Sequence, residues 1–171
     1  MTVRIENAAP ADLEDCVAIW ARAIEARDGV DDPAVPGRAR AKLTAPRRLA
    51  WLVARDGETP VAFALASEGG TGTVGPHDPA GYAYLGLLAV APGAWGRGIA
   101  TQLLDRLAVE LAATGAPGAY LHVLTENTGA IRRYEGAGWH PFGEVFAHPA
   151  TGRPSLTYVT EFASTDVGGA A

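Results

Sequence analysis

The stretch from residue 82 to residue 101 decides the fold of this 171-residue chain, and it reads YAYLGLLAVAPGAWGRGIAT. Its first half is an apolar run that predicts a buried strand, and Pro92 ends that strand. Its second half carries Gly96 and Gly98, and the leucines at 103, 104, 107 and 111 predict a helix that begins inside this glycine loop. Because the first N–H groups of a helix have no internal partner, and the helix dipole favours negative charge there, this junction predicts an anion site.

The predicted anion site comprises Gly96, Arg97, Gly98, Ile99, Ala100 and Thr101. The small residues let a phosphate approach the backbone, Thr101 adds a hydroxyl, and Arg97 adds a charge that either reaches the phosphate or stays in solvent. A P-loop would need Gly-Lys-Ser/Thr, which is absent. A dinucleotide fingerprint would need a third glycine at position 101, and it normally lies in the first βαβ unit.

The patterns on both sides predict the order β-α-α-β-β-β-α-β-α-β-β, an α/β (α+β) fold in which helices cover a mixed sheet. Asp12 is the expected N-cap of the first helix, and Gly136 to Gly138 are expected to close the last one. The strands are expected at 2–6, 50–54, 60–66, 82–90, 119–124, 139–146 and 155–162, and the helices at 12–28, 38–47, 99–111 and 128–135.

The amino-acid composition limits the class of protein to which this chain can belong. Apolar residues make up 48% and charged residues 19%, so we expect one globular domain over 1–163, with a small, polar, frayed tail at 164–171. Lys and Arg are not concentrated anywhere, which disfavours nucleic acid as a partner, and the net charge of −5 mildly favours cationic substrates. Without a signal peptide or an 18-residue apolar run, we expect a cytoplasmic protein with no membrane partner.

The numbers and positions of cysteine and histidine limit the disulfide and metal chemistry that can be expected. The single cysteine, Cys16, excludes an internal disulfide, and it lies on the apolar face of the first predicted helix, as a core residue does. Four scattered histidines with one cysteine offer no metal-ligand spacing, so no metal is expected.

Two ordered motifs resemble those of the GCN5-related N-acetyltransferase (GNAT) family. In the first, an apolar strand ends in Val90-x-Pro92 and leads into Gly96-x-Gly98-x-Ala100. This family usually has Arg or Gln where Trp95 stands, so a side-chain contact to phosphate is lost there. The second motif consists of Asn127, Ala130, Tyr134, Gly138 and Trp139. The resemblance covers roughly the whole chain.

This resemblance implies a mostly antiparallel sheet of about seven strands with about four helices, and acetyl-CoA as cosubstrate. Backbone groups of Leu88, Ala89 and Val90 would pair with the pantetheine arm, which acts as a pseudo-strand between two splayed strands. The pyrophosphate would sit on the amides from Gly96 to Thr101, and Asn127 would contact the cofactor arm. The acceptor would be a primary amine of a small molecule or peptide, and dimers are common in the family.

The resemblance assigns Tyr134 as the acid that protonates the leaving thiolate. The chemistry needs such a group, because an amine attacks the thioester directly and collapse of the intermediate expels a thiolate. The alternative is a half-buried tyrosine that only packs against its neighbours.

The general base is harder to assign. Many family members carry a Glu on the central strand, but this strand contains no acid. Another branch of the family uses a Glu five residues before the Asn, where this chain has His122, and histidine suits deprotonation of an ammonium. The alternative for His122 is a strand histidine bonded to a neighbour. Lesser candidates for the base are His77, Asp78 and Glu126, and His140 and His148 are candidates for lining the acceptor pocket.

Three hypotheses follow from the sequence. The first is an active acetyl-CoA-dependent N-acetyltransferase that acts in a ternary complex. The second is a non-catalytic acyl-CoA-binding or regulatory module of the same fold, which the missing strand glutamate allows. The third is a nucleotide-binding protein that shares only the phosphate loop.

Overall fold

A computed structural model describes residues 2–69 and 76–163 of the chain. The N-terminal half begins with β1 (Val3–Asn7), a short 3-10 turn η1 (Pro10–Asp12), α1 (Leu13–Asp28) and α2 (Val35–Thr44). Next come the hairpin of β2 (Arg48–Asp56) and β3 (Thr59–Glu68), then β4 (Ala83–Val90). The second half consists of η2 (Pro92–Ala94), α3 (Ile99–Ala113), β5 (Gly118–Leu124), α4 (Thr128–Gly136), β6 (His140–Ala147) and β7 (Pro154–Glu161).

The strands form one seven-stranded sheet in the order β1-β2-β3-β4-β5-β7-β6. Every neighbouring pair is antiparallel except β4 and β5, which are parallel. A parallel pair needs a crossover, and α3 supplies it. The predicted fold class and element order are therefore confirmed over the described residues.

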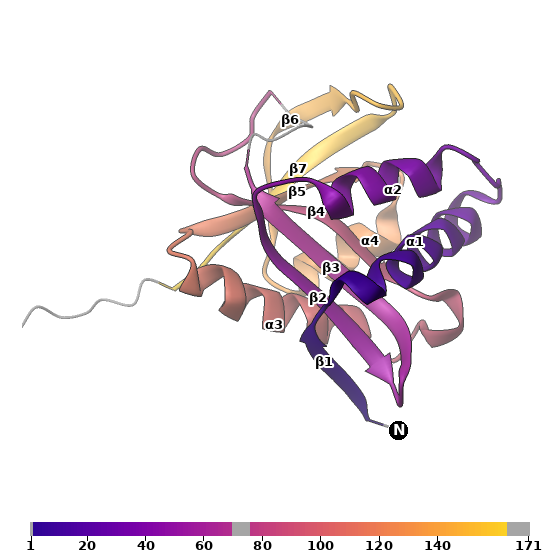
Figure 1. The fold of residues 1–171 in the computed structure, drawn as a ribbon. Helices are drawn as coiled ribbons and strands as arrows, with labels where there is room; N and C mark the ends of the chain where they lie inside the picture. The colour runs from indigo at the N-terminus through magenta and orange to yellow at the C-terminus, as the bar shows by residue number, and fades with distance from the viewer. Residues whose placement is uncertain (1, 70–75, 164–171) are drawn as a thin grey trace, which may run out of the picture.

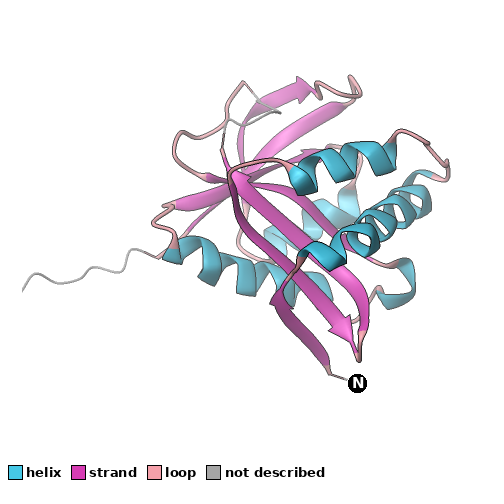
Figure 2. Cartoon of the chain, in the orientation of Figure 1, coloured by secondary structure: helices cyan, strands magenta, loops and turns pink. Residues whose placement is uncertain are grey.

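Helices cover both faces of the sheet (Figure 1; Figure 2). On one face, α1 and α2 bury Cys16, Ile19 and Leu43 against residues of β2, β3 and β4. On the other face, α3 presents the predicted apolar stripe, whose members are at most 5% exposed: Ile99, Leu103, Leu104, Leu107 and Leu111. Cys16 is a core residue, as expected, and burial raises the pKa of its thiol to about 12.

Two local expectations need correction. Asp12 stands at the N-cap position of α1 but does not cap that helix; its carboxylate accepts a hydrogen bond from the Ala9 amide and pairs with Arg55 instead. The second helix spans 35–44 rather than 38–47, because Pro36 is compatible with a first helical turn. The expected glycine closure of α4 is confirmed, because the helix ends at Gly136 and Gly138 has a positive φ of 89°.

The predicted tail at 164–171 and part of the predicted loop at 67–79 lie outside the described residues. Within the described ranges, no helix combines the length and apolar character needed to cross a bilayer.

Candidate active site

The two parallel strands in the middle of the sheet pair over only a short distance. Their register joins Ala83 to Ala119 and Tyr84 to Tyr120, and no later residues of β4 and β5 are paired. The bulge at Gly86 in β4, where the register with β3 shifts, follows directly. Beyond this point the facing edges of β4 and β5 diverge and carry backbone groups without a strand partner, so an extended ligand could pair with them.

The backbone groups of successive β4 residues point alternately toward β3 and toward the gap between β4 and β5. The Ala91 amide donates to the Val61 carbonyl of β3, and hydrogen-bonded pairs alternate along an antiparallel ladder. Ala89 therefore turns its backbone groups toward β3, whereas Leu88 and Val90 turn theirs toward the gap. The indole Nε1 of Trp95 donates to the Val90 carbonyl at 2.8 Å, so that acceptor already has a partner within the chain.

The glycine loop lies at the end of β4 that borders the gap. Gly96 and Gly98 have positive φ angles of 77° and 72°, which non-glycine residues rarely adopt, and Gly98 is the N-cap of α3. The Gln102 amide makes the first bond of the helix, to the Gly98 carbonyl at 3.2 Å. The preceding amides of the first turn have no acceptor within the helix, and the predicted anion site therefore has the backbone geometry of one.

The side chain of Arg97 points elsewhere than expected. Its guanidinium pairs with the Asp56 carboxylate at 2.9 Å, at the turn between β2 and β3. The sequence left open whether this charge reaches a phosphate or stays in solvent, and in the structure an internal carboxylate holds it. Any phosphate contact of Arg97 through its side chain would have to compete with this ion pair.

Asn127 and Tyr134 belong to α4, which begins just beyond the end of β5. Asn127 is the N-cap, and its side-chain oxygen accepts from the Ala130 amide at 3.3 Å. Because parallel strands end at the same edge of a sheet, the starts of α3 and α4 border the same end of the gap. Tyr134 is 9% exposed, its ring centroid lies 5.8 Å from that of Trp139, and burial raises the pKa of its hydroxyl to about 12.

His122 of β5 pairs with Asp78 from the segment before β4. Its Nε2 lies 2.6 Å from Asp78 Oδ1, and the exposed fractions of the two side chains are 2% and 9%. The His122 Nδ1 atom is buried without a hydrogen-bond partner. The rings of Tyr84, Tyr120 and Phe146 lie 5.1–5.8 Å from the imidazole, centroid to centroid, and fix its orientation.

His122 and Tyr134 approach the sheet from opposite faces. His122 contacts Tyr84 and Tyr120, whereas Tyr134 belongs to the core cluster that contains Leu121 and Val123. Neighbouring residues along a strand point to opposite faces. A ligand that enters the gap between β4 and β5 would therefore meet one group from each side.

The remaining candidate residues for the general base and for the acceptor pocket lie in different parts of the structure. His140 pairs with Glu161 at the exposed edge of β6, and Glu126 pairs with Arg153.

The ring of His77 packs against Gly143, where a Cβ atom would lie 2.5 Å from His77 Cγ. His148 lies in the β6–β7 turn, where burial and then the charge of Lys42 lower its pKa. Of the histidines named as pocket candidates, only His148 adjoins the His122 region.

Sequence reasoning missed Lys42. It belongs to α2, whose pattern was too weak to orient its side chains, and its Nζ donates to the Gly86 carbonyl at 3.3 Å. The Nζ atom also lies 5.8 Å from the centroid of the Tyr84 ring. One signal was available, because Lys42 is the only lysine among fourteen Lys and Arg residues.

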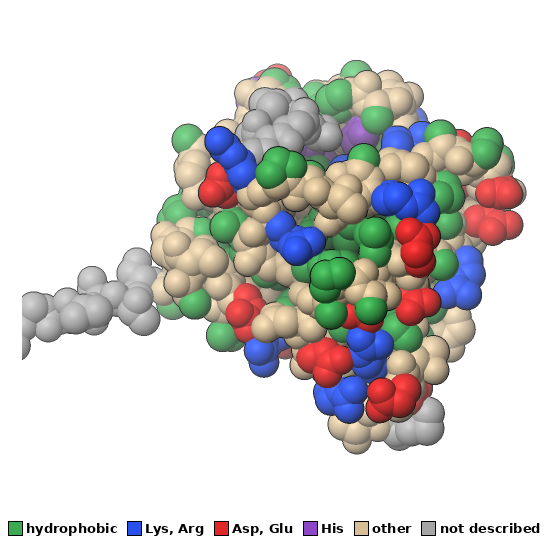
Figure 3. Space-filling view, viewed as in Figure 1, with side chains coloured by type: hydrophobic (Ala, Val, Ile, Leu, Met, Phe, Trp, Pro, Cys, Tyr) green, Lys and Arg blue, Asp and Glu red, His purple; other side chains and the backbone are tan. Residues whose placement is uncertain are grey.

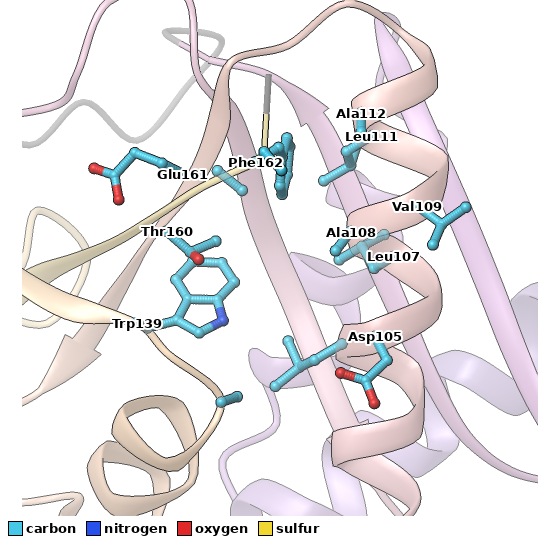
Figure 4. A pocket seen from close by; sticks show the side chains of 14 residues that line it. Asp105, Leu107, Ala108, Val109, Leu111, Ala112, Trp139, Thr160, Glu161 and Phe162 are labelled. Atoms are coloured by element: carbon cyan, nitrogen blue, oxygen red, sulfur yellow. The ribbon is translucent and has the colours of Figure 1, made fainter. Parts of the chain in front are cut away.

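An apolar groove lies elsewhere on the protein, between α3 and the ends of β5 and β7 (Figure 4). Its walls include Leu107 and Ala108 from α3, with Trp139 and Phe162 opposite, and among the described residues its titratable lining groups are Asp105 and Glu161. None of the predicted site residues lines this groove, so we place the candidate site at the gap, where the chemistry-bearing groups converge. The described residues contain no cluster of His, Cys, Asp and Glu suited to a metal ion.

Comparison with known proteins identifies related chains. The model of the acetyltransferase (GNAT) family matches residues 14–139. Among solved structures, the ribosomal-protein-S18-alanine N-acetyltransferase from Escherichia coli superimposes with a TM-score of 0.72 at 19% identity, covering 98% of each chain. A putative phosphinothricin N-acetyltransferase gives a TM-score of 0.74 at 17% identity, covering 95% of this chain and all of that one. The PaiA N-acetyltransferase from Thermoplasma acidophilum, solved with coenzyme A, gives 0.68 at 15% identity over 95% of this chain and all of that one.

Proposed function

This chain belongs to the acetyltransferase (GNAT) family, and from that premise we propose that it transfers an acetyl group from acetyl-CoA to a primary amine of a small molecule or peptide. The observation that carries the proposal is the divergence of β4 and β5 in front of the glycine loop. This gap offers unpaired backbone for the pantetheine arm and helix N–H groups for the pyrophosphate. The PaiA enzyme, which was solved with coenzyme A, shares the fold.

The cofactor side of the proposed site comprises backbone groups and one amide side chain. Leu88 and the Val90 amide pair with the pantetheine arm, while Ala89 lies between them and keeps β4 attached to β3. The amides from Gly96 to Thr101 hold the pyrophosphate. Asn127 fixes the start of α4 with its side-chain oxygen, which leaves its amide nitrogen to contact the cofactor arm.

The proposed chemistry is direct attack. The deprotonated acceptor nitrogen forms a bond to the thioester carbonyl carbon, the carbon–sulfur bond breaks, and the second proton that the nitrogen loses as the amide forms goes to the departing sulfur. We assign the ammonium proton to the Asp78–His122 pair rather than to His122 alone, since Asp78 holds one ring nitrogen and is the less buried member. The Tyr134 hydroxyl donates to the leaving sulfur from the opposite face.

Calorimetry tests the cofactor assignment. Acetyl-CoA should bind saturably, whereas NAD and ATP should not. Gly96→Ala should weaken acetyl-CoA binding, because a Cβ atom disfavours the positive φ that directs the loop amides. Gly93→Ala is the matched control, since Gly93 has no positive φ and a Cβ atom there would meet nothing within 4 Å. Absent acetyl-CoA binding, or equal losses in the two variants, would contradict the assignment.

Thiol release in the presence of amines tests the activity. We expect at least one class among amino acids, polyamines, aminoglycosides and peptides to raise turnover well above the slow hydrolysis of acetyl-CoA. If acetyl-CoA binds and no acceptor raises turnover, the chain is instead the non-catalytic acyl-CoA-binding module of the same fold.

A further inference from the structure

The single lysine of the chain occupies an unusual position. Thirteen of the fourteen Lys and Arg residues are arginines, and Lys42 is the exception. Its side chain is only partly exposed, in the last turn of α2, and its Nζ lies between the Gly86 carbonyl and the Tyr84 ring. The ring of Tyr84 in turn lies 5.4 Å from that of His122. Lys42 therefore adjoins the proposed catalytic pair on the α1–α2 face of the sheet.

The charge of Lys42 is not neutralised by the part of the chain that the structure describes. No carboxylate in residues 2–69 or 76–163 lies within 4.0 Å of its Nζ. Burial lowers the pKa of Lys42, and the charge of Arg38 lowers it further. A partly desolvated ammonium whose partners among the described residues are a carbonyl and a ring is costly, and an anion beside it would offset that cost.

The neighbouring cations differ from Lys42 in having carboxylate partners. Arg38 pairs with Asp32 at 2.8 Å. Arg153 pairs with Glu126 and lies 3.4 Å from Asp28. Asp28 and Asp32, which partner Arg153 and Arg38, bound the connection between α1 and α2, so the ion pairs lie near the start of α2. Burial and then the charges of Lys42, His122, Arg153 and Arg38 lower the pKa of His148 in the β6–β7 turn. Figure 3 shows histidine and Lys or Arg surface together between α2 and this hairpin.

The phosphates of coenzyme A are too distant to be the missing anion. The Gly86 carbonyl, which Lys42 contacts, precedes Val90 by four residues of β4. At about 3.3 Å per strand residue, this places Lys42 roughly 13 Å upstream of the end of the strand. The glycine loop lies beyond that end, so a pyrophosphate bound there cannot neutralise Lys42. An anion that neutralises Lys42 would therefore enter from the acceptor side.

We propose that the acceptor amine carries an anionic oxyacid group, a carboxylate or a phosphonate, and that Lys42 binds this group. This inference rests on the proposed transferase function and names the acceptor class for it. It reverses the expectation from net charge, because the acidic surface favours cationic substrates whereas the acceptor side of the site is locally cationic. Lys42 is then a binding residue that fixes the orientation of the amine beside the Asp78–His122 pair.

A matched acceptor panel tests the proposal. We would compare kcat/KM for the twenty amino acids with that for their twenty amides, and include aminoalkylphosphonates to distinguish the two oxyacid groups. The wild type should prefer the acid over its amide. Lys42→Met should lower that preference by about 30-fold, because truncating one partner of a buried charge pair is costly. Lys42→Arg should retain part of it, and Arg22→Met, which removes an exposed cation on α1, should leave it unchanged.

A second measurement does not depend on turnover. Because Lys42 is the only lysine, protein labelled with ¹³C at the lysine ε carbon gives one lysine signal. With free coenzyme A present, an acid from the acceptor panel that the enzyme prefers should shift this signal and move its titration midpoint to higher pH. The matching amide should change neither the signal nor its midpoint. Lys42→Met removes the signal and confirms its assignment.

The two proposals fail in different ways. If acids and amides are acetylated equally and neither shifts the lysine signal, the proposed anion site is wrong while the transferase proposal stands. If nothing is acetylated but an acid shifts the signal and its amide does not, the anion site stands while the transferase proposal fails. Acetylation of Lys42 itself by acetyl-CoA alone, detected by peptide mass, would make Lys42 an acceptor and overturn its assignment as the anion-binding group.

Discussion

Replacing Tyr134 by phenylalanine removes one hydroxyl from the proposed site and leaves the packing against Trp139 in place. Burial raises the pKa of this hydroxyl to about 12, whereas a thiol ordinarily has a pKa of about 8.5. The difference of about 3.5 units corresponds to about 5 kcal/mol at 1.36 kcal/mol per unit. Complete proton transfer from Tyr134 to a thiolate is therefore uphill, and we expect Tyr134 to act as a hydrogen-bond donor to the sulfur as charge develops.

The magnitude follows from that role. A hydrogen bond to a charged group contributes about 1.5–3 kcal/mol, so Tyr134→Phe should lower kcat by roughly 10- to 150-fold. The KM for acetyl-CoA should change little, because the bond strengthens only as the thiolate forms. Thiol release at saturating acetyl-CoA and acceptor measures both constants.

The control is Tyr158→Phe, which removes the same group from a tyrosine whose hydroxyl donates to Glu135 at 3.0 Å. This variant loses that hydrogen bond to α4 but removes no group of the proposed site, so it should keep the wild-type kcat. The pH profile adds a second check. Since the pKa of Tyr134 is raised rather than lowered, the hydroxyl stays protonated through pH 10, and its ionisation should not limit the rate there. A kcat of Tyr134→Phe within twofold of wild type would refute the reasoning, as would a fall in wild-type rate near pH 9 that this variant abolishes.

Three further variants test other parts of the structure. Asp78→Asn keeps the shape beside His122 but removes the carboxylate, and it should lower kcat by about 100-fold or more in the thiol-release assay, in the range of general-base effects; a wild-type rate would exclude the pair as the base. Trp95→Phe removes the indole N–H that anchors the end of β4, and the loss of a neutral hydrogen bond should lower the free energy of unfolding by about 0.5–1.5 kcal/mol in urea. Asp12→Ala removes the buried carboxylate beside Arg55, which keeps its second partner Glu6 at 2.6 Å, so the free energy of unfolding should fall by about 1–3 kcal/mol in urea with little effect on kcat; a loss below about 0.5 kcal/mol would mean that the pair is no more stabilising than a surface ion pair.

The sequence by itself determined the order of strands and helices and the place of the glycine loop. These features are local, because apolar periodicity, Pro92, and glycines such as Gly98 act on the backbone within a few residues. The same holds for the two motifs that resemble the GNAT family. Even there, the local pattern predicted a helix cap that does not form. The Asp12 carboxylate pairs with Arg55, which lies 43 residues away in sequence, instead of capping the first helix.

Only the tertiary structure decided which side chains meet. Asp78 and His122 are 44 residues apart in sequence, and Lys42 reaches a carbonyl that is also 44 residues away. These meetings depend on strand order, on register and on the bulge in β4, none of which a local pattern encodes. The glycine loop could be predicted to be an anion site from its own residues, whereas the proposed base and acceptor side could not, because they are assembled from segments that become neighbours only when the sheet forms.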